Sequence, residues 1–246
     1  MATVYIEQTD KTISGIDKLH FSIQEHDRVD FIKYGDMYRF PNTTEITVTP
    51  NVSSETFYAD DSPVITYAAT GDVAVSITQA HLPQLVLATL LGSPVDGAVR
   101  HLTSTAKAPY VGIAFRVTMS DDTYQFVKLY KGKFQEPEMT ATTKEGSISF
   151  QPRTINATFI ATSFEKEVGG KTHKLIMSAV DESAEGYKQE GDTWFDSIHE
   201  ATAPAFVPSA SYGKGAVVLH EGKFYRAKAT FTATETFVAS DWEEIV

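Results

Sequence analysis

Short runs of β-branched and aromatic residues recur along this chain, and they constrain its fold more than any other feature. Residues 45–49 ("EITVT") and 73–77 ("VAVSI") are rich in such side chains. Residues 111–119 ("VGIAFRVTM") and 124–134 ("YQFVKLYKGKF") flank the polar turn "SDDT", which predicts a hairpin. Residues 154–162 ("TINATFIAT") alternate between apolar and polar side chains, as a half-buried strand does. The series predicts a mainly β protein with a β-sandwich or barrel-like main domain.

One segment has the features of a helix instead. In "HLPQLVLATLLGS", Pro83 suits a first helical turn and Gly92 suits the end of the helix. The apolar side chains at helical spacing are Leu82, Val86 and Leu90, with Leu85 and Ala88 beside them. We expect this helix to flank the sheet and to cover one of its faces.

The composition changes near residue 200. The segment "IHEATAPAFVPSASYG" contains two prolines and no lysine or arginine, and a new pattern of short strands follows it. This predicts a main domain over 1–200, a linker over 201–210 and a small β module over 211–246. A module of that size needs its aromatic residues for stability.

Four of these aromatic residues are candidates for contact with carbohydrate. Aromatic rings on short strands can stack on sugar rings, because their faces carry a large apolar area. The alternative is that the rings form the small core of the module itself. The sequence leaves both interpretations open for Tyr212, Phe224, Tyr225 and Trp242.

No arrangement of residues in the sequence points to catalysis. The chain has no cysteine, which excludes disulfides, thiolate metal sites and cysteine nucleophiles. "VGGKTHK" ends like a P-loop, but the first glycine of that motif would fall at Glu165, so a glycine turn between two strands is the better interpretation. No G-x-S-x-G or H-E-x-x-H motif occurs. We therefore expect no enzyme, no cofactor and no metal site.

The net charge is -11, so the chain lacks the basic surface that grips phosphates. The charge has two interpretations: solubility through self-repulsion, or a surface past which nucleic acid moves without binding. No apolar run approaches the length of a membrane span, and "MATVYIEQTDKTISG" lacks the basic and apolar regions of a signal peptide. We expect no membrane insertion.

Three blocks together resemble the phi13-type major tail proteins of long-tailed bacteriophages. They are residues 55–92, residues 108–138 and "WFDSI" at 194–198, and "GIDKLHFSI" from Gly15 is also similar. The resemblance covers roughly residues 10–200. Residues 211–246 resemble small chitin-binding-type carbohydrate-binding modules, although an early tryptophan usual in those modules is missing.

The resemblance implies a structural virion protein, a subunit of the phage tail tube. Six copies would form a ring, and the rings would stack into a hollow conduit through which double-stranded DNA passes without specific binding. The partners implied are other copies of the chain, the tape measure and the tail terminator. The protein would be assembled in the cytoplasm of the host bacterium and located in the virion. The alternative function is a glycan-binding protein whose C-terminal aromatic module contacts a cell-surface polysaccharide, such as host cell-wall glycan.

Two segments are candidates for the loop that connects stacked rings. One covers residues 40–55, with Asn42, Thr44, Asn51 and Ser53; the other is "FQEPEMTATTKEG" at 134–146. We favour the first, because its polar, proline-containing sequence suits an element that only a partner orders. The stretch "QFVKLYKGKFQEPE", a strand that continues into an acidic extension, suggests a sheet edge completed by a neighbouring copy.

Overall fold

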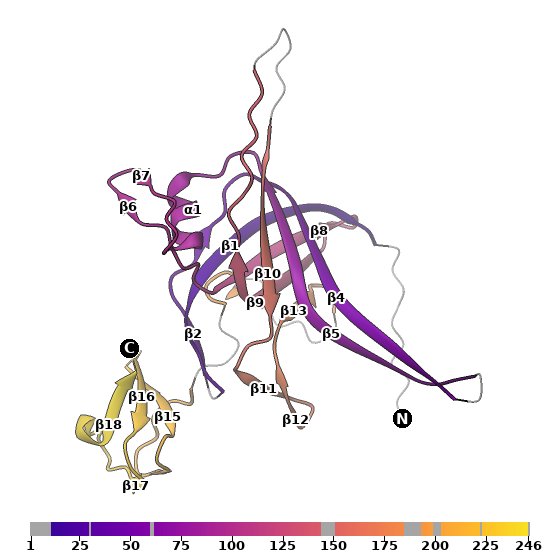
Figure 1. Ribbon diagram of the computed structural model, residues 1–246. Helices are drawn as coiled ribbons and strands as arrows, with labels where there is room; N and C mark the ends of the chain where they lie inside the picture. Colours follow the sequence, from indigo (N-terminus) through magenta and orange to yellow (C-terminus); the bar gives the residue numbers. More distant parts are fainter. Residues whose placement is uncertain are drawn as a thin grey trace. The chain divides into compact units, whose positions relative to one another are not determined.

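The computed structural model describes the chain except for residues 1–10, 30, 60–61, 144–150, 185–192, 199–202, 222 and 246. The described part is mainly β, as the sequence predicts, with one α-helix and no closed barrel (Figure 1). It forms two compact units. Unit 1 contains Met1–Gln24, Gly35–Ala161 and Ile176–Ile198, and unit 2 contains Glu25–Tyr34, Thr162–Leu175 and His199–Val246. This division differs from the boundary expected near residue 200, because two earlier segments belong to the second unit.

Unit 1 is built on one antiparallel sheet with the strand order β1-β8-β9-β10-β5-β4. Its strands are β1 (Ile13–Asp27, with its last residues in unit 2), β4 (Thr43–Ala59), β5 (Ser62–Gln79), β8 (Val111–Met119), β9 (Tyr124–Phe134) and β10 (Arg153–Ile160). Two short strands join the sheet: β3 (Tyr38–Arg39) pairs with β1, and β13 (Met177–Asp181) pairs with β9. Strands β6 (Val95–Asp96) and β7 (Val99–Arg100) form a separate small hairpin.

The predicted hairpin around "SDDT" is confirmed, because β8 and β9 have the expected bounds and pair with each other. The alternation in β10 is also confirmed: Ile155, Ala157 and Phe159 are buried, whereas Asn156 and Thr158 face away from the core. The edge suggested for residues 125–138 is wrong. Strand β9 pairs with β8 on one side and with β10 and β13 on the other, so it lies inside the sheet.

The core of unit 1 gathers side chains from β1, β5, β8, β9 and β10, and the helix contributes to the same cluster. Helix α1 (Gln84–Leu91) begins after Pro83 and ends at Gly92, whose φ of 61° allows its N–H to reach the carbonyl of Ala88. The helix buries Leu87, Ala88, Leu90 and Leu91. The expected apolar stripe is therefore partly wrong, since Leu85 is 54% exposed.

Unit 2 consists of short strands. Strands β15 (Val217–His220), β16 (Lys223–Ala227) and β18 (Trp242–Ile245) form a three-stranded sheet, with the turn η1 (Ala239–Asp241) before β18. Strands β14 (Ser211–Tyr212) and β17 (Phe231–Thr232) pair with each other, and β2 (Ile32–Tyr34) pairs with β1. Strands β11 (Glu165–Val168) and β12 (Lys171–Lys174) form a hairpin that turns at Gly169 and Gly170, as the sequence predicts.

The core of unit 2 includes a residue from far earlier in the chain. Phe31 is fully buried and stacks on Phe224, with 5.2 Å between ring centroids, in a cluster that includes Ala203. The backbone N–H groups of Ser163 and Phe164 donate hydrogen bonds to the Asp27 carboxylate at 2.8–3.1 Å. The expected linker takes part in this unit as well, because Ala203 is buried and residue 205 bridges to β15. The C-terminal module is therefore completed by residues from three segments of the chain.

Candidate functional site

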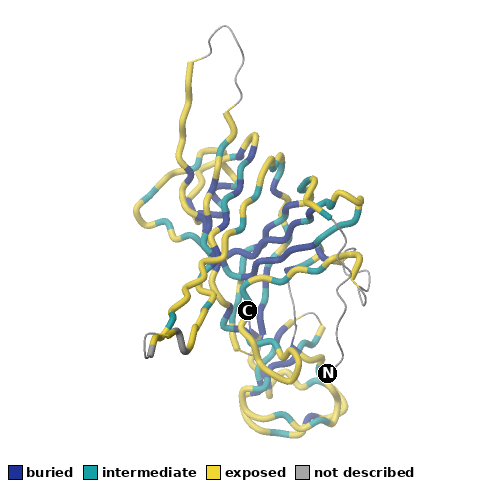
Figure 2. Tube along the Cα trace, turned by 90° about the vertical axis from the view of Figure 1, so that its right-hand side faces the viewer, coloured by how far each residue is buried: buried dark blue, intermediate teal, exposed yellow. Residues whose placement is uncertain are grey.

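A long two-stranded arm in unit 1 is almost wholly exposed. Strands β4 and β5 pair along their whole length, but β10 pairs with β5 only over Val73–Gln79. Beyond that point the two strands pair only with each other within the described part of the chain, over residues 51–59 and 62–72. We call this part the arm. Figure 1 shows it projecting from the sheet, and Figure 2 shows that its surface is almost wholly exposed.

One face of the arm is apolar. Cross-strand pairing sets Phe57 opposite Ile65 and Glu55 opposite Tyr67, and residues two apart on a strand share a face. Phe57, Ile65 and Tyr67 are 64%, 63% and 71% exposed. Large apolar side chains gathered on an exposed surface mark an interaction site.

The opposite face of the arm carries Thr56 and Thr66, together with the exposed Val52. The hydroxyl groups of Thr56 and Thr66 lie 3.1 Å apart across the two strands. The only charged residues in the described part of the arm are Glu55 and Asp72, so burial of its apolar face would remove little charge from water. We call the side that carries Phe57, Ile65 and Tyr67 the arm face.

The residues expected in an inter-ring loop lie along β4 and in the turn before it, and two of them, Asn51 and Ser53, belong to the arm. Asn42 occupies a turn with a φ of 58°, and Thr44, Asn51 and Ser53 belong to β4. Their side chains bond to β5: Thr44 Oγ1 donates to the carbonyl of residue 78 at 3.1 Å, and Asn51 Nδ2 donates to Asp72 at 3.1 Å. The segment expected to be a loop is thus a strand that is already ordered by pairing with β5. Sequence reasoning did not identify the side chains of the arm face as an interaction surface.

An apolar groove opens at the end of the unit 1 core. It has a volume of about 630 Å³ and lies between the start of β1 and the base of β4. Its apolar lining includes Ile16, Ile46, Val48, Phe115, Val117 and Val127, together with Met177. Ile16, Ile46 and Val48 are only partly buried, so the core is incomplete on this side.

Both strands beside the groove have an unpaired edge. Among the described strands, β4 ends the strand order and pairs only with β5. Over Ile13–Ile16, β1 pairs with β8 and with no other strand in the part of the chain that the structure describes. Unpaired edges bind further strands readily.

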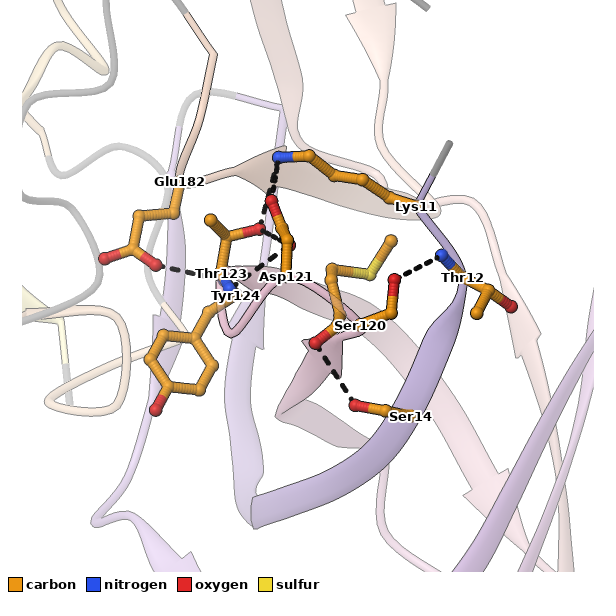
Figure 3. Close-up of polar contacts among 9 residues, drawn as sticks. Lys11, Thr12, Ser14, Ser120, Asp121, Thr123, Tyr124 and Glu182 are labelled. Carbon is orange, nitrogen blue, oxygen red and sulfur yellow. Dashed lines mark hydrogen bonds and ion pairs between the residues drawn. The ribbon is translucent and has the colours of Figure 1, made fainter. Parts of the chain in front are cut away.

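A polar network fixes the start of β1 at the rim of the groove (Figure 3). Ser14 Oγ donates to the carbonyls of residues 118 and 119, and the N–H of Thr12 donates to Ser120 Oγ at 3.2 Å. Lys11 Nζ lies 2.5 Å from a carboxylate oxygen of Asp121. The hydrogen bonds from Lys11 and Thr123 lower the pKa of Asp121 from 3.8 to about 2. The network therefore holds one wall of the groove in place.

The four aromatic residues considered for carbohydrate contact have different environments. Phe224 and Trp242 are buried, and they belong to the core of unit 2. Tyr212 is half-buried, and its hydroxyl bonds to both backbone groups of residue 207. Tyr225 is half-buried beside Phe237, with 4.7 Å between their centroids.

Sequence reasoning missed two further rings of this group. The His220 and Phe237 rings are stacked with 4.1 Å between their centroids, and both are half-buried. Tyr225, Phe237 and His220 therefore form one partly exposed aromatic cluster. No motif in the sequence singles out the histidine.

Comparison with protein-family models gives no match for this chain, and no curated protein matches it either. In the described residues, no helix has both the length and the apolar character needed to cross a membrane. The same part of the chain contains no group of three or more His, Asp or Glu side chains placed to hold a metal ion.

Proposed function

We propose that this protein is a structural subunit of a phage tail tube, which forms hexameric rings that stack into a hollow conduit for DNA. The observation that carries the proposal is the arm: a fully paired hairpin whose apolar face has no partner within its own chain among the described residues. The resemblance of residues 10–200 to phi13-type major tail proteins supplies the kind of assembly. Other tail proteins, such as the tape measure and the tail terminator, are its expected partners in the virion.

Two features support assembly rather than catalysis, one of unit 1 and one of the whole chain. The open edges of β4 and of the start of β1 can each accept a further strand, and a closed ring would remove both from solvent. The net charge of -11 offers DNA no cationic partner, which suits passage without binding.

Electron microscopy across a concentration series tests the proposal. We expect hollow rings or tubes of uniform width from the unaltered chain. The double variant Phe57→Ser/Tyr67→Ser should stay monomeric with an unchanged fold, because both side chains are exposed in the single chain. The matched control Thr56→Ser/Thr66→Ser alters the opposite face of the same arm and should assemble normally. Normal tubes from the Phe57/Tyr67 variant would show that the arm face is not required for assembly. The absence of any ordered assembly by the unaltered chain would contradict the proposed function.

A second candidate function is contact with a cell-surface polysaccharide by unit 2. The observation that favours it is the partly exposed cluster of His220, Tyr225 and Phe237, since stacked aromatic rings can bind sugar faces. Retention on a chitin column should be lost in Tyr225→Ala and Phe237→Ala if this function is correct. Trp242→Ala is unsuitable for this test because Trp242 is only 3% exposed, so its loss would disturb the core.

A further inference from the structure

The apolar groove of unit 1 and the arm face have matching chemistry, although they belong to different parts of the chain. The groove is lined mainly by aliphatic and aromatic side chains, and Glu45 is its only charged residue. The arm face presents Phe57, Ile65 and Tyr67 with one charge, Glu55, beside them. Contact between the two would therefore bury apolar surface on both sides at a small cost in desolvated charge.

We infer that the groove is the seat of the arm face of a second copy of this chain. The inference rests on the proposed function, in which copies assemble through their arms, and it names the surface that receives the arm. The occupant would complete the partly exposed side of the core formed by Ile16, Ile46 and Val48. Its backbone would also lie next to the unpaired edge of β4 or of the start of β1.

The arm of the same chain cannot occupy the groove. Val48 and Pro50, which line the groove, and Phe57 belong to one continuous strand that is paired along its length. At about 3.3 Å per residue, Phe57 lies roughly 20 Å beyond Pro50 along the strand. A paired strand cannot turn back over that distance without breaking its hydrogen bonds, so the arm must come from another copy.

The sizes are also compatible. A volume of about 630 Å³ falls within the roughly 300–1,000 Å³ of cavities that enclose a whole small ligand, so it has room for several large side chains. An aromatic side chain carries about 150–250 Å² of surface, and the arm-face rings are about two-thirds exposed. Phe57, Tyr67 and Ile65 therefore offer on the order of 300–450 Å². That is about half of the ~800 Å² that each partner buries in a standard interface, and strand pairing would supply more.

Disulfide trapping between two variants tests the inference, because the chain contains no cysteine of its own. One preparation carries Tyr67→Cys on the arm face. The other carries Val48→Cys in the groove or, as the matched control, Thr47→Cys on the opposite face of the same strand. The two are mixed at assembly concentrations and oxidised, and mixed disulfides are counted by mass spectrometry with one partner isotope-labelled. Phe57→Cys and Ile65→Cys are tried in the same way, since a disulfide requires close Cα atoms.

We expect at least one arm position to form several-fold more mixed disulfide with residue 48 than with residue 47. Equal yields at the two positions, or a preference for residue 47, would overturn the inference. If no arm position prefers residue 48 but microscopy shows tubes, the proposed function stands and only the assignment of the groove as the seat of the arm fails. A preference for residue 48 in small oligomers that never form rings or tubes would support the groove and contradict the tube.

Discussion

Replacing Phe31 with alanine should strongly destabilise unit 2, although Phe31 lies in the chain far from the C-terminal module. The side chain is fully buried, and it stacks on Phe224 inside a cluster made mostly of residues from that module. Its removal leaves a cavity at the centre of this cluster, where the short strands β15, β16 and β18 offer little material to fill it.

The expected loss can be set against the stability of the unit. Truncation of a buried phenylalanine to alanine costs about 3–5 kcal/mol. A unit of this size, at roughly 0.05–0.15 kcal/mol per residue, has a free energy of unfolding on the order of 4–10 kcal/mol. The substitution therefore removes a large part of the stability of unit 2, and it touches none of the core residues of unit 1.

Hydrogen exchange read by mass spectrometry resolves the two units. In Phe31→Ala, peptides from β15, β16 and β18 should lose most of their protection, whereas peptides from β8 and β9 should keep theirs. The control is Val29→Ala, two residues away in the same segment. Val29 is 61% exposed, so its truncation should change the stability by no more than about 0.5 kcal/mol.

Unchanged protection of the C-terminal strands in Phe31→Ala would refute the reasoning. It would mean that residues 211–246 fold without a contribution from the segment Glu25–Tyr34, as a separate module would.

Two further predictions concern unit 1. The Asp121→Asn variant should be less stable than the unaltered chain at neutral pH, and the difference should close as the pH falls from about 4 to 2. The reason is that the pKa of Asp121 in the folded protein is lowered to about 2, so the stabilisation by its carboxylate is present above the ordinary pKa of 3.8 and is lost when the carboxylate is protonated. Midpoints of thermal unfolding, measured against pH at low salt, report the difference in stability between the two proteins. A difference that stays constant from about pH 4 to 2 would contradict the prediction. Gly132→Ala should cost about 1–3 kcal/mol, because the new Cβ would lie 2.6 Å from the buried Phe159 ring. Urea unfolding measures that cost, with Gly15→Ala as the control, since its Cβ would meet nothing closer than 4.0 Å; equal losses in both variants would show that the close contact has no particular effect.

Local signals in the sequence account for much of the fold. The β8–β9 hairpin follows from two alternating runs around a polar turn, and both ends of helix α1 follow from Pro83 and Gly92. The glycine turn at 169–170 follows in the same way. Each of these features is determined by residues that are close in sequence, so the pattern alone is sufficient.

The arm could be predicted only in part, because its order comes from the pairing of two consecutive strands and not from apolar content. Residues 51–56 are mostly polar, and Pro50 resembles a break in a strand. The structure places Pro50 in β4 beside an irregularity in the register, on a strand that ends the sheet. A proline is tolerated at such a position because an edge strand does not need every N–H.

The candidate site was also beyond local reasoning. The groove gathers residues from β1, β4, β8, β9 and β13, and only the curvature of the sheet brings them together. Phe31 is a similar case, since nothing in its neighbourhood indicates that its partners lie near residue 224. Phe224 and Trp242, which were expected to contact sugar, are buried instead. A small unit needs its largest apolar side chains in its core.

The burial of Phe31 also sets an order of events during synthesis. Phe31 leaves the ribosome well before Val217, Phe224 and Ile245, which surround it in the folded chain. At roughly 5–20 residues per second, the phenylalanine and its segment wait on the order of 10–40 s for these partners. Throughout that interval the nascent chain displays an unburied aromatic ring. A chain that terminates before residue 217 never covers it, so the synthesis of residues 217–245 also removes a binding site for chaperones and proteases.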